Sequence, residues 1–87
     1  MRISLNQSQM DYLMNEFHVH QVVPDNNSIV GGFIMVLKHH RVGRSVMLLT
    51  HYSTEEGLLW HKDKGGNIPA IVVWADFSTV EELQSRA

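Results

Sequence analysis

The hydrophobic positions near the start of the chain follow a helical period. They recur at the i, i+3, i+4 and i+7 spacing that lines one face of an α-helix. These positions are Met10, Leu13, Met14 and Phe17. Asn6 is suited to cap this helix, because Gln9 follows it three residues later in the pattern of a capping box. The sequence therefore predicts an N-terminal helix that begins after Asn6.

From His18 onward the pattern changes to that of β-strands separated by turns. Clusters of turn-forming residues recur at intervals of about ten residues and separate short apolar runs, as in a β-meander. The expected strands are 18–23, 33–39, 45–52, 57–62 and 68–75.

Two of these segments also admit a helix. Residues 28–40 fit a 3.6-residue period, and residues 53–56 match a capping box. Glycines fall in the first turns of both alternative helices, at Gly31 and Gly32 and at Gly57, and glycine disfavours helix there. We therefore expect a strand at 33–39 and a turn at 53–56.

The chain ends in a second helical pattern. Ser78 and Glu81 form a capping box, and Val80 and Leu83 make a narrow inward stripe. The 87 residues are enough for one domain, 1–87, and too few for two. The predicted fold class is α+β: an antiparallel β-meander of four to five strands, with an N-terminal helix and a short C-terminal helix packed on the sheet.

Composition narrows the class of protein. Hydrophobic residues make up 44% and charged residues 18%, which is typical of a folded chain. The net charge of −2 excludes a globally basic protein. The absence of cysteine excludes disulfides, thiolate metal sites and a cysteine nucleophile. The first residues lack the apolar run of a signal peptide, and no apolar stretch is long enough for a membrane helix, so we expect a cytoplasmic protein without a membrane partner.

The six histidines are the main candidates for chemistry. His18 and His20 would project from one face of a strand, where two imidazoles can share a metal ion. No third ligand accompanies them at a metal-binding spacing, so a histidine-ligated metal protein stays an alternative and we expect no cofactor. The residue types of a hydrolase triad are present in Ser45 or Ser53, a histidine and Asp76. The chain has no GxSxG motif, so we expect no catalytic residues and no enzyme.

The predicted meander collects basic residues at one end of the sheet. Its turns at 40–44 and 63–67 share one edge, where Asp63 is the only acid, whereas five acidic residues share the opposite edge. The predicted basic rim contains Lys38, His39, His40, Arg41, Arg44, Lys62 and Lys64. The predicted acidic edge contains Glu55, Glu56, Asp76, Glu81 and Glu82. Trp60 or Trp74 faces outward in one interpretation and anchors a partner, because tryptophan is enriched at interface centres.

These patterns predict a small non-enzymatic binding protein of the regulator or inhibitor type, as is typical of bacteria and phages. It would dock a macromolecular partner through the basic rim and Trp60. Protein is the expected partner, since no aromatic residue interrupts 38–44 and the net charge is negative; a nucleic-acid-binding module that uses the same rim is the alternative. We also expect a homodimer, because the apolar runs exceed what a thin core needs and the strands at the edges are open.

Overall fold

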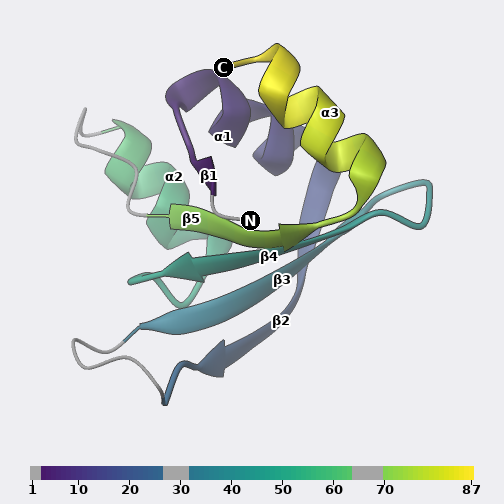
Figure 1. Cartoon of the computed structure of the whole chain (residues 1–87). Helices are drawn as coiled ribbons and strands as arrows, with labels where there is room; N and C mark the ends of the chain where they lie inside the picture. Colours follow the sequence, from purple (N-terminus) through teal and green to yellow (C-terminus); the bar gives the residue numbers. More distant parts are fainter. Residues whose placement is uncertain (1–2, 27–31, 64–69) are drawn as a thin grey trace.

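The computed structural model describes residues 3–26, 32–63 and 70–87, without the side chains of residues 60–63 (Figure 1). Its elements are β1 (Ile3–Ser4), α1 (Gln7–Glu16), β2 (Phe17–Pro24), β3 (Phe33–His39), β4 (Ser45–Thr50), α2 (Glu55–Asp63), β5 (Ala70–Ala75) and α3 (Phe77–Ser85). Within the described residues, the strands form one antiparallel sheet in the order β1-β5-β4-β3-β2. The predicted α+β fold, with a meander-like sheet and a helix from each end of the chain, is confirmed.

Helix α1 begins as its sequence predicts. The Asn6 side-chain oxygen accepts a hydrogen bond from the Gln9 backbone N–H, and the Gln9 side-chain oxygen accepts one from the Asn6 N–H, both at 2.8 Å. This capping box satisfies two N–H groups that a helix start leaves without partners. The amide nitrogen of the buried Gln9 also donates to the Leu83 carbonyl at 2.8 Å, so the cap of α1 is tied to α3.

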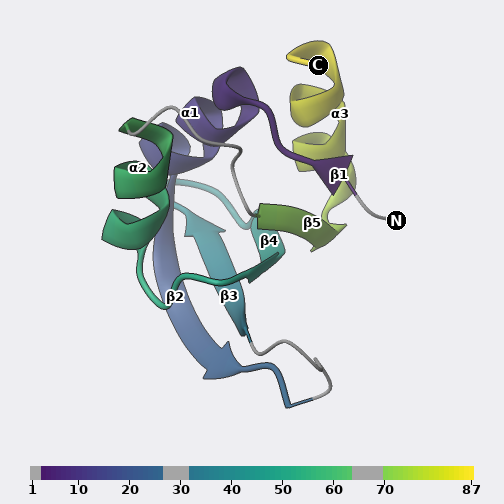
Figure 2. The same ribbon diagram turned by 90° about the vertical axis from the view of Figure 1, so that its left-hand side faces the viewer.

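The sheet buries one face and leaves the other open. Along β4, Val46, Leu48 and Thr50 are buried, whereas Met47 and Leu49 between them are only half-buried. The buried residues of α1, α2 and α3 join those of the sheet in a single core, so the helices cover the same face (Figure 2). The core contains Met10, Leu13, Phe17, Met35, Leu37, Val46, Leu48, Leu58, Val72 and Leu83 among its fully buried members.

The predicted strand over 57–62 is wrong, because helix α2 spans these residues. The Thr54 side-chain oxygen accepts a hydrogen bond from the Gly57 N–H at 3.1 Å, so the helix is capped one residue after Ser53, the first residue of the 53–56 capping-box match. Leu58 is fully buried in the core. A Cβ atom at Gly57 would lie 2.8 Å from Cδ1 of Tyr52. The glycine is therefore explained by the close approach of an aromatic ring and not by a turn.

Smaller differences concern the ends of elements. Strand β1 was not expected, and it pairs with β5 through Ile3 opposite Val72. Helix α3 is capped by Asp76, whose side chain accepts from the Thr79 N–H, and not by Ser78. Strand β4 ends at Thr50 rather than at residue 52. The alternative helix over 28–40 is excluded from residue 33 onward by β3, and residues 28–31 lie outside the described residues, as do 68 and 69 of the last predicted strand.

Candidate partner-binding site

The turn between β3 and β4, residues 40–44, is built around His39. The His39 N–H donates to the Arg44 carbonyl at 3.0 Å, and His39 Nδ1 accepts from the backbone N–H groups of Arg41 at 3.0 Å and Val42 at 3.3 Å. The imidazole stands edge-on to Phe17, with 5.2 Å between ring centroids. His39 was predicted to face a partner; the structure instead uses its ring to shape the turn and to pack on the core.

Arg44 is also directed into the fold. Its guanidinium donates to the hydroxyl of Tyr12 on α1, with 3.4 Å between nitrogen and oxygen. Burial raises the pKa of Tyr12, and the hydrogen bond and charge of Arg44 offset part of that rise. The side chain joins the turn to α1 and is half-buried, so it offers a partner little free charge.

Asp76 lies at the same end of the sheet as Arg44. Its carboxylate accepts the Ser45 N–H at 2.7 Å and the Thr79 N–H at 3.0 Å. Burial acts to raise the pKa of Asp76, but these hydrogen bonds and the charge of Arg44 outweigh burial and hold the pKa below its usual value. The prediction that the acidic edge lies away from the basic turn is therefore wrong for Asp76.

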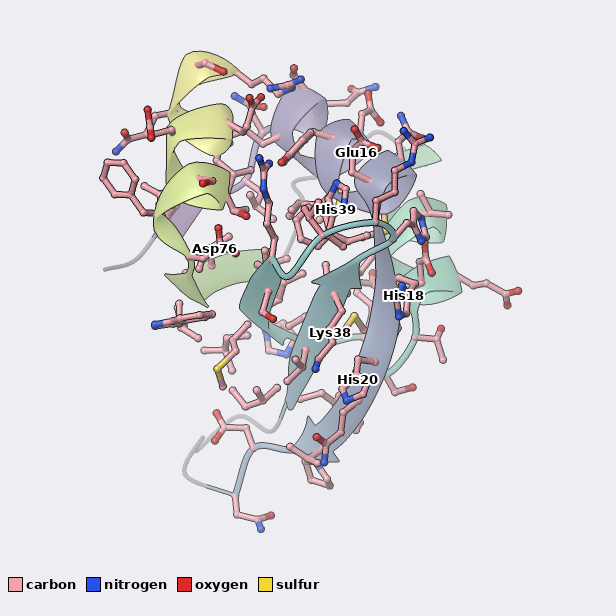
Figure 3. The ribbon with its side chains drawn as sticks, turned by 90° about the vertical axis from the view of Figure 1, so that its right-hand side faces the viewer. Glu16, His18, His20, Lys38, His39 and Asp76 are labelled. Atoms are coloured by element: carbon pink, nitrogen blue, oxygen red, sulfur yellow. The ribbon has the colours of Figure 1, made fainter. Side chains whose placement is uncertain are left out.

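Lys38, His40 and Arg41 are exposed around this turn, and β2 brings histidines beside them. His18 is the neighbour of Lys38 across the β2–β3 pair. The rings of His18 and His40 stack with 5.4 Å between centroids and 19° between planes, and the His40 N–H donates to the Glu16 carbonyl at 3.0 Å. Figure 3 shows His18, His20 and Lys38 along the neighbouring strands. We call His18, His20, Lys38, His40 and Arg41 the basic patch.

A β-bulge lies at His20. Val19 is opposite Leu37 and Gln21 is opposite Val36, so His20 has no residue directly across from it. A bulge interrupts the alternation of side chains along a strand. The rule that residues two apart share a face fails here for Val19 and Gln21, because Leu37, the partner of Val19, is buried and Val36, the partner of Gln21, is not.

The geometry of the histidines does not favour a metal site. Among the residues that the structure describes, no group of three or more histidine, aspartate or glutamate side chains is placed to hold an ion. His18 and His40 stack with nearly parallel planes. Two ligating imidazoles instead aim a nitrogen each at a common point.

The other half of the predicted rim is not brought to this turn. Lys62 belongs to α2, which follows β4, whereas the turn at 40–44 precedes β4; the two lie at opposite ends of that strand (Figure 1). Trp60 is likewise in α2 and not on a strand next to Trp74. Lys64 lies outside the described residues. The grouping of Lys62 and Lys64 with 40–44 depended on the incorrect strand at 57–62.

The exposed aromatic residues are found elsewhere. Trp74 on β5 is 49% exposed and Phe77 at the start of α3 is 79% exposed, while Val42 in the turn is 52% exposed. Trp74 was one of the two tryptophans predicted to face outward. Phe77 is part of an amphipathic helix start in the sequence, and nothing in its pattern distinguishes it from a core position.

Comparison with known proteins identifies no relative. No protein-family model matches the chain, and neither the curated proteins nor the solved structures contain a match. In the described part of the chain, no helix has both the length and the apolar character that a membrane crossing requires. The geometry of the site is therefore the basis for any functional conclusion.

Proposed function

We propose that the protein is a small non-enzymatic binding protein, of the regulator or inhibitor type, that docks an acidic surface of a protein partner through the basic patch. The observation that carries this proposal is the convergence of Lys38, His40 and Arg41 with His18 at one corner of the sheet, all of them exposed. These residues come from two strands and a turn, so the corner presents several hydrogen-bond donors to one partner.

The rigidity of this corner supports a binding role. The turn that carries Arg41 is held by three hydrogen bonds that involve His39, through its backbone N–H and its Nδ1. His40 is fixed by its backbone bond to Glu16 and by its stacking on His18. A surface that is ordered before it meets its partner loses less conformational entropy on binding.

Charge favours a protein partner over a nucleic acid. The chain has a net charge of −2, and the patch contains two permanent cations, Lys38 and Arg41. Nucleic-acid sites neutralise many phosphates and commonly stack bases on aromatic side chains. The exposed tryptophan and phenylalanine of the described structure, Trp74 and Phe77, belong to β5 and α3 and not to the strands that carry the patch. A protein surface that offers carboxylates to the patch and an apolar side chain to Val42 matches it better than a nucleic acid does.

The test compares two charge reversals of the same chemical type. Lys38→Glu combined with Arg41→Glu changes the patch, whereas Lys62→Glu changes a lysine of α2 at the other end of β4. Each tagged protein is cross-linked in extract of its host, and the captured protein is then purified and titrated. We expect capture by the wild type and by Lys62→Glu, and affinity at least tenfold weaker for the double variant.

Three results would overturn the proposal. Equal affinity of the double variant and the wild type would exclude the patch, and a loss with Lys62→Glu alone would move the site to α2. Binding of a random DNA or RNA 20-mer that weakens steeply with salt and disappears in the double variant would show a nucleic-acid module instead.

A further inference from the structure

The face of the sheet opposite the helices is apolar and open. Its outward-facing side chains form rows across the strands: Val36 is opposite Met47, which is opposite Trp74, and Ile34 is opposite Leu49, which is opposite Ile71. We call Ile34, Val36, Met47, Leu49, Ile71 and Trp74 the open face. These side chains are half-buried or exposed, whereas the central residues that alternate with them are completely buried: Met35, Leu37, Val46, Leu48 and Val72.

The open face is a larger contiguous apolar surface than a small monomeric domain normally exposes. Val23 on β2, which is 38% exposed, continues the row of Ile34 to the edge of the sheet. An antiparallel sheet that faces water on one side normally alternates apolar and polar residues. Here β3 and β4 are apolar on both faces over most of their length. Such a contiguous apolar surface is typical of an interaction site.

Charge indicates which partner fits. Among the described strand residues that face this side, Lys38 is the single permanently charged residue, and it lies in the last row, with His18 and Ser45 as neighbours. The acidic pairs Glu55–Glu56 and Glu81–Glu82 are on helices, which cover the other face. The open face therefore offers a charged partner almost no residue of opposite charge. A second copy of the same apolar face fits it, because no carboxylates would be brought together.

The edge of the sheet is a poorer route to self-association. Strand β2 forms one edge, and it is interrupted by the bulge at His20 and ends in Pro24. Bulges and prolines on edge strands oppose the addition of another strand. Face-to-face packing of two sheets does not need a free edge, and it occurs at a separation of about 10 Å.

The size of the face fits a reversible association. The open face spans three strands at about 4.8 Å spacing and two rows about 6.6 Å apart, which is roughly 200 Å² in projection on each copy. Two such faces, even with the relief of the side chains included, bury less than the roughly 1,200 Å² of accessible surface below which protein interfaces are typically weak and transient. An interface of this size is consistent with a dimer in equilibrium with its monomer.

From these observations we infer that the open face is the interface of a reversible homodimer, with two sheets packed face to face as in a β-sandwich. This inference is independent of the proposed partner. Lys38 and His18 of the basic patch are in the row that follows the open face, and Arg41 and His40 belong to the turn beyond it, outside the paired rows.

The test is the solution mass of the wild type and of two matched variants. Val36→Glu puts a carboxylate in the centre of the open face, and Val42→Glu makes the same change at an exposed valine in the turn. In sedimentation equilibrium from about 1 µM to several hundred micromolar, we expect the wild type and Val42→Glu to rise from 10.0 kDa toward twice that mass. Val36→Glu should stay at 10.0 kDa with an unchanged circular dichroism spectrum.

A second measurement protects the test against a variant that fails to fold. Because the chain has no cysteine, Met47→Cys and Val42→Cys each introduce one thiol at a known place. A short thiol-specific cross-linker should join two Met47→Cys chains and leave Val42→Cys unjoined at the same concentration. A wild type that remains monomeric at every concentration, with no cross-linking through residue 47, would overturn the inference. A dimer that survives Val36→Glu and cross-links through residue 42 instead would also overturn it.

Discussion

Asp76 and Ser45 bind each other at the end of the sheet. The Asp76 carboxylate accepts the Ser45 N–H at 2.7 Å, and the Asp76 N–H donates to the Ser45 carbonyl at 3.3 Å. The same carboxylate caps α3 through the Thr79 N–H at 3.0 Å. Asp76, which directly follows β5, therefore joins the start of β4 to the start of the C-terminal helix.

Replacement of Asp76 should destabilise the domain more than the loss of an ordinary helix cap. Asp76→Ala removes the cap of α3 and leaves the Ser45 N–H without its acceptor, and we expect a loss of about 2 to 3 kcal/mol of unfolding free energy. Asp76→Ser keeps a capping oxygen for Thr79 and should lose about half as much. Urea denaturation of the three proteins measures the difference. Equal stability of Asp76→Ala and the wild type would contradict the joining role.

The lowered pKa of Asp76 predicts acid sensitivity with a definite sign. Because the folded state holds the pKa of Asp76 below its value in the unfolded chain, the fold favours the carboxylate. The resulting stability is present above the unfolded pKa, about 3.9, and is lost as the pH falls from there through the lower folded pKa. Between about pH 5 and pH 2, Asp76→Asn should therefore show a shallower fall in stability than the wild type. Parallel pH profiles of the two proteins would disprove this.

His39 should be replaceable by asparagine but not by alanine. The turn at 40–44 uses His39 Nδ1 as the acceptor for the N–H groups of Arg41 and Val42. An asparagine side chain carries its amide oxygen as many bonds from the backbone as Nδ1 of histidine, so His39→Asn should retain most of the turn. His39→Ala loses both bonds and the contact with Phe17, and we expect a cost of about 1 to 2 kcal/mol in thermal or urea unfolding. Equal costs for the two variants would show that Nδ1 is not the stabilising group.

Alanine should destabilise the protein at Gly57 and not at Gly43. In a helix interior, alanine is normally better than glycine by about 1 kcal/mol. A Cβ at Gly57 would lie 2.8 Å from Cδ1 and 3.0 Å from Cβ of Tyr52, whereas a Cβ at Gly43 meets nothing within 4 Å. Gly57→Ala should therefore lower the melting temperature, and Gly43→Ala should leave it unchanged or slightly raised. A higher melting temperature for Gly57→Ala would show that α2 does not pack on Tyr52 in this way.

The stacked rings of His18 and His40 should be energetically coupled. Ring pairs in contact are worth about 0.5 to 1.5 kcal/mol beyond the area they bury, and the lower end applies to these exposed side chains. A double-mutant cycle with His18→Ala and His40→Ala measures the coupling from unfolding free energies. A cycle of His20→Ala with His40→Ala serves as the control and should show less coupling. Strict additivity for His18 and His40 would exclude a contact between them.

Much of the fold could be predicted from the sequence because its signals are local. The cap formed by Asn6 and Gln9 lies within three residues of chain, and it starts α1 where predicted. The alternation in β4 likewise marks which side chains face the helices. Such signals depend on the backbone geometry of a few successive residues and operate before any distant contact is made.

The candidate site could be predicted only in part, because its members are far apart in the sequence. Lys38, His40 and Arg41 share one hairpin, and their proximity follows from its short turn. His18 joins them through the register of β2 with β3, which no short turn determines, and the bulge at His20 changes that register. Lys62 was grouped with them by a strand that does not form.

The sequence by itself therefore determined the α+β class, the capped helix at the start and the apolar alternation of the central strands. Tertiary structure alone decided that residues 55–63 are helical, that Arg44 and His39 serve the fold, and that one apolar face of the sheet is left open. The physical reason is the same in each case: Gly57 accepts the ring of Tyr52, Arg44 reaches Tyr12, and the helices have enough apolar surface to cover one side of the sheet. Arg44 and Tyr12 are far apart in the sequence, as are the helices and the strands they cover, whereas Tyr52 and Gly57 are five residues apart. Local propensity does not determine any of these side-chain contacts, which form only when the core packs.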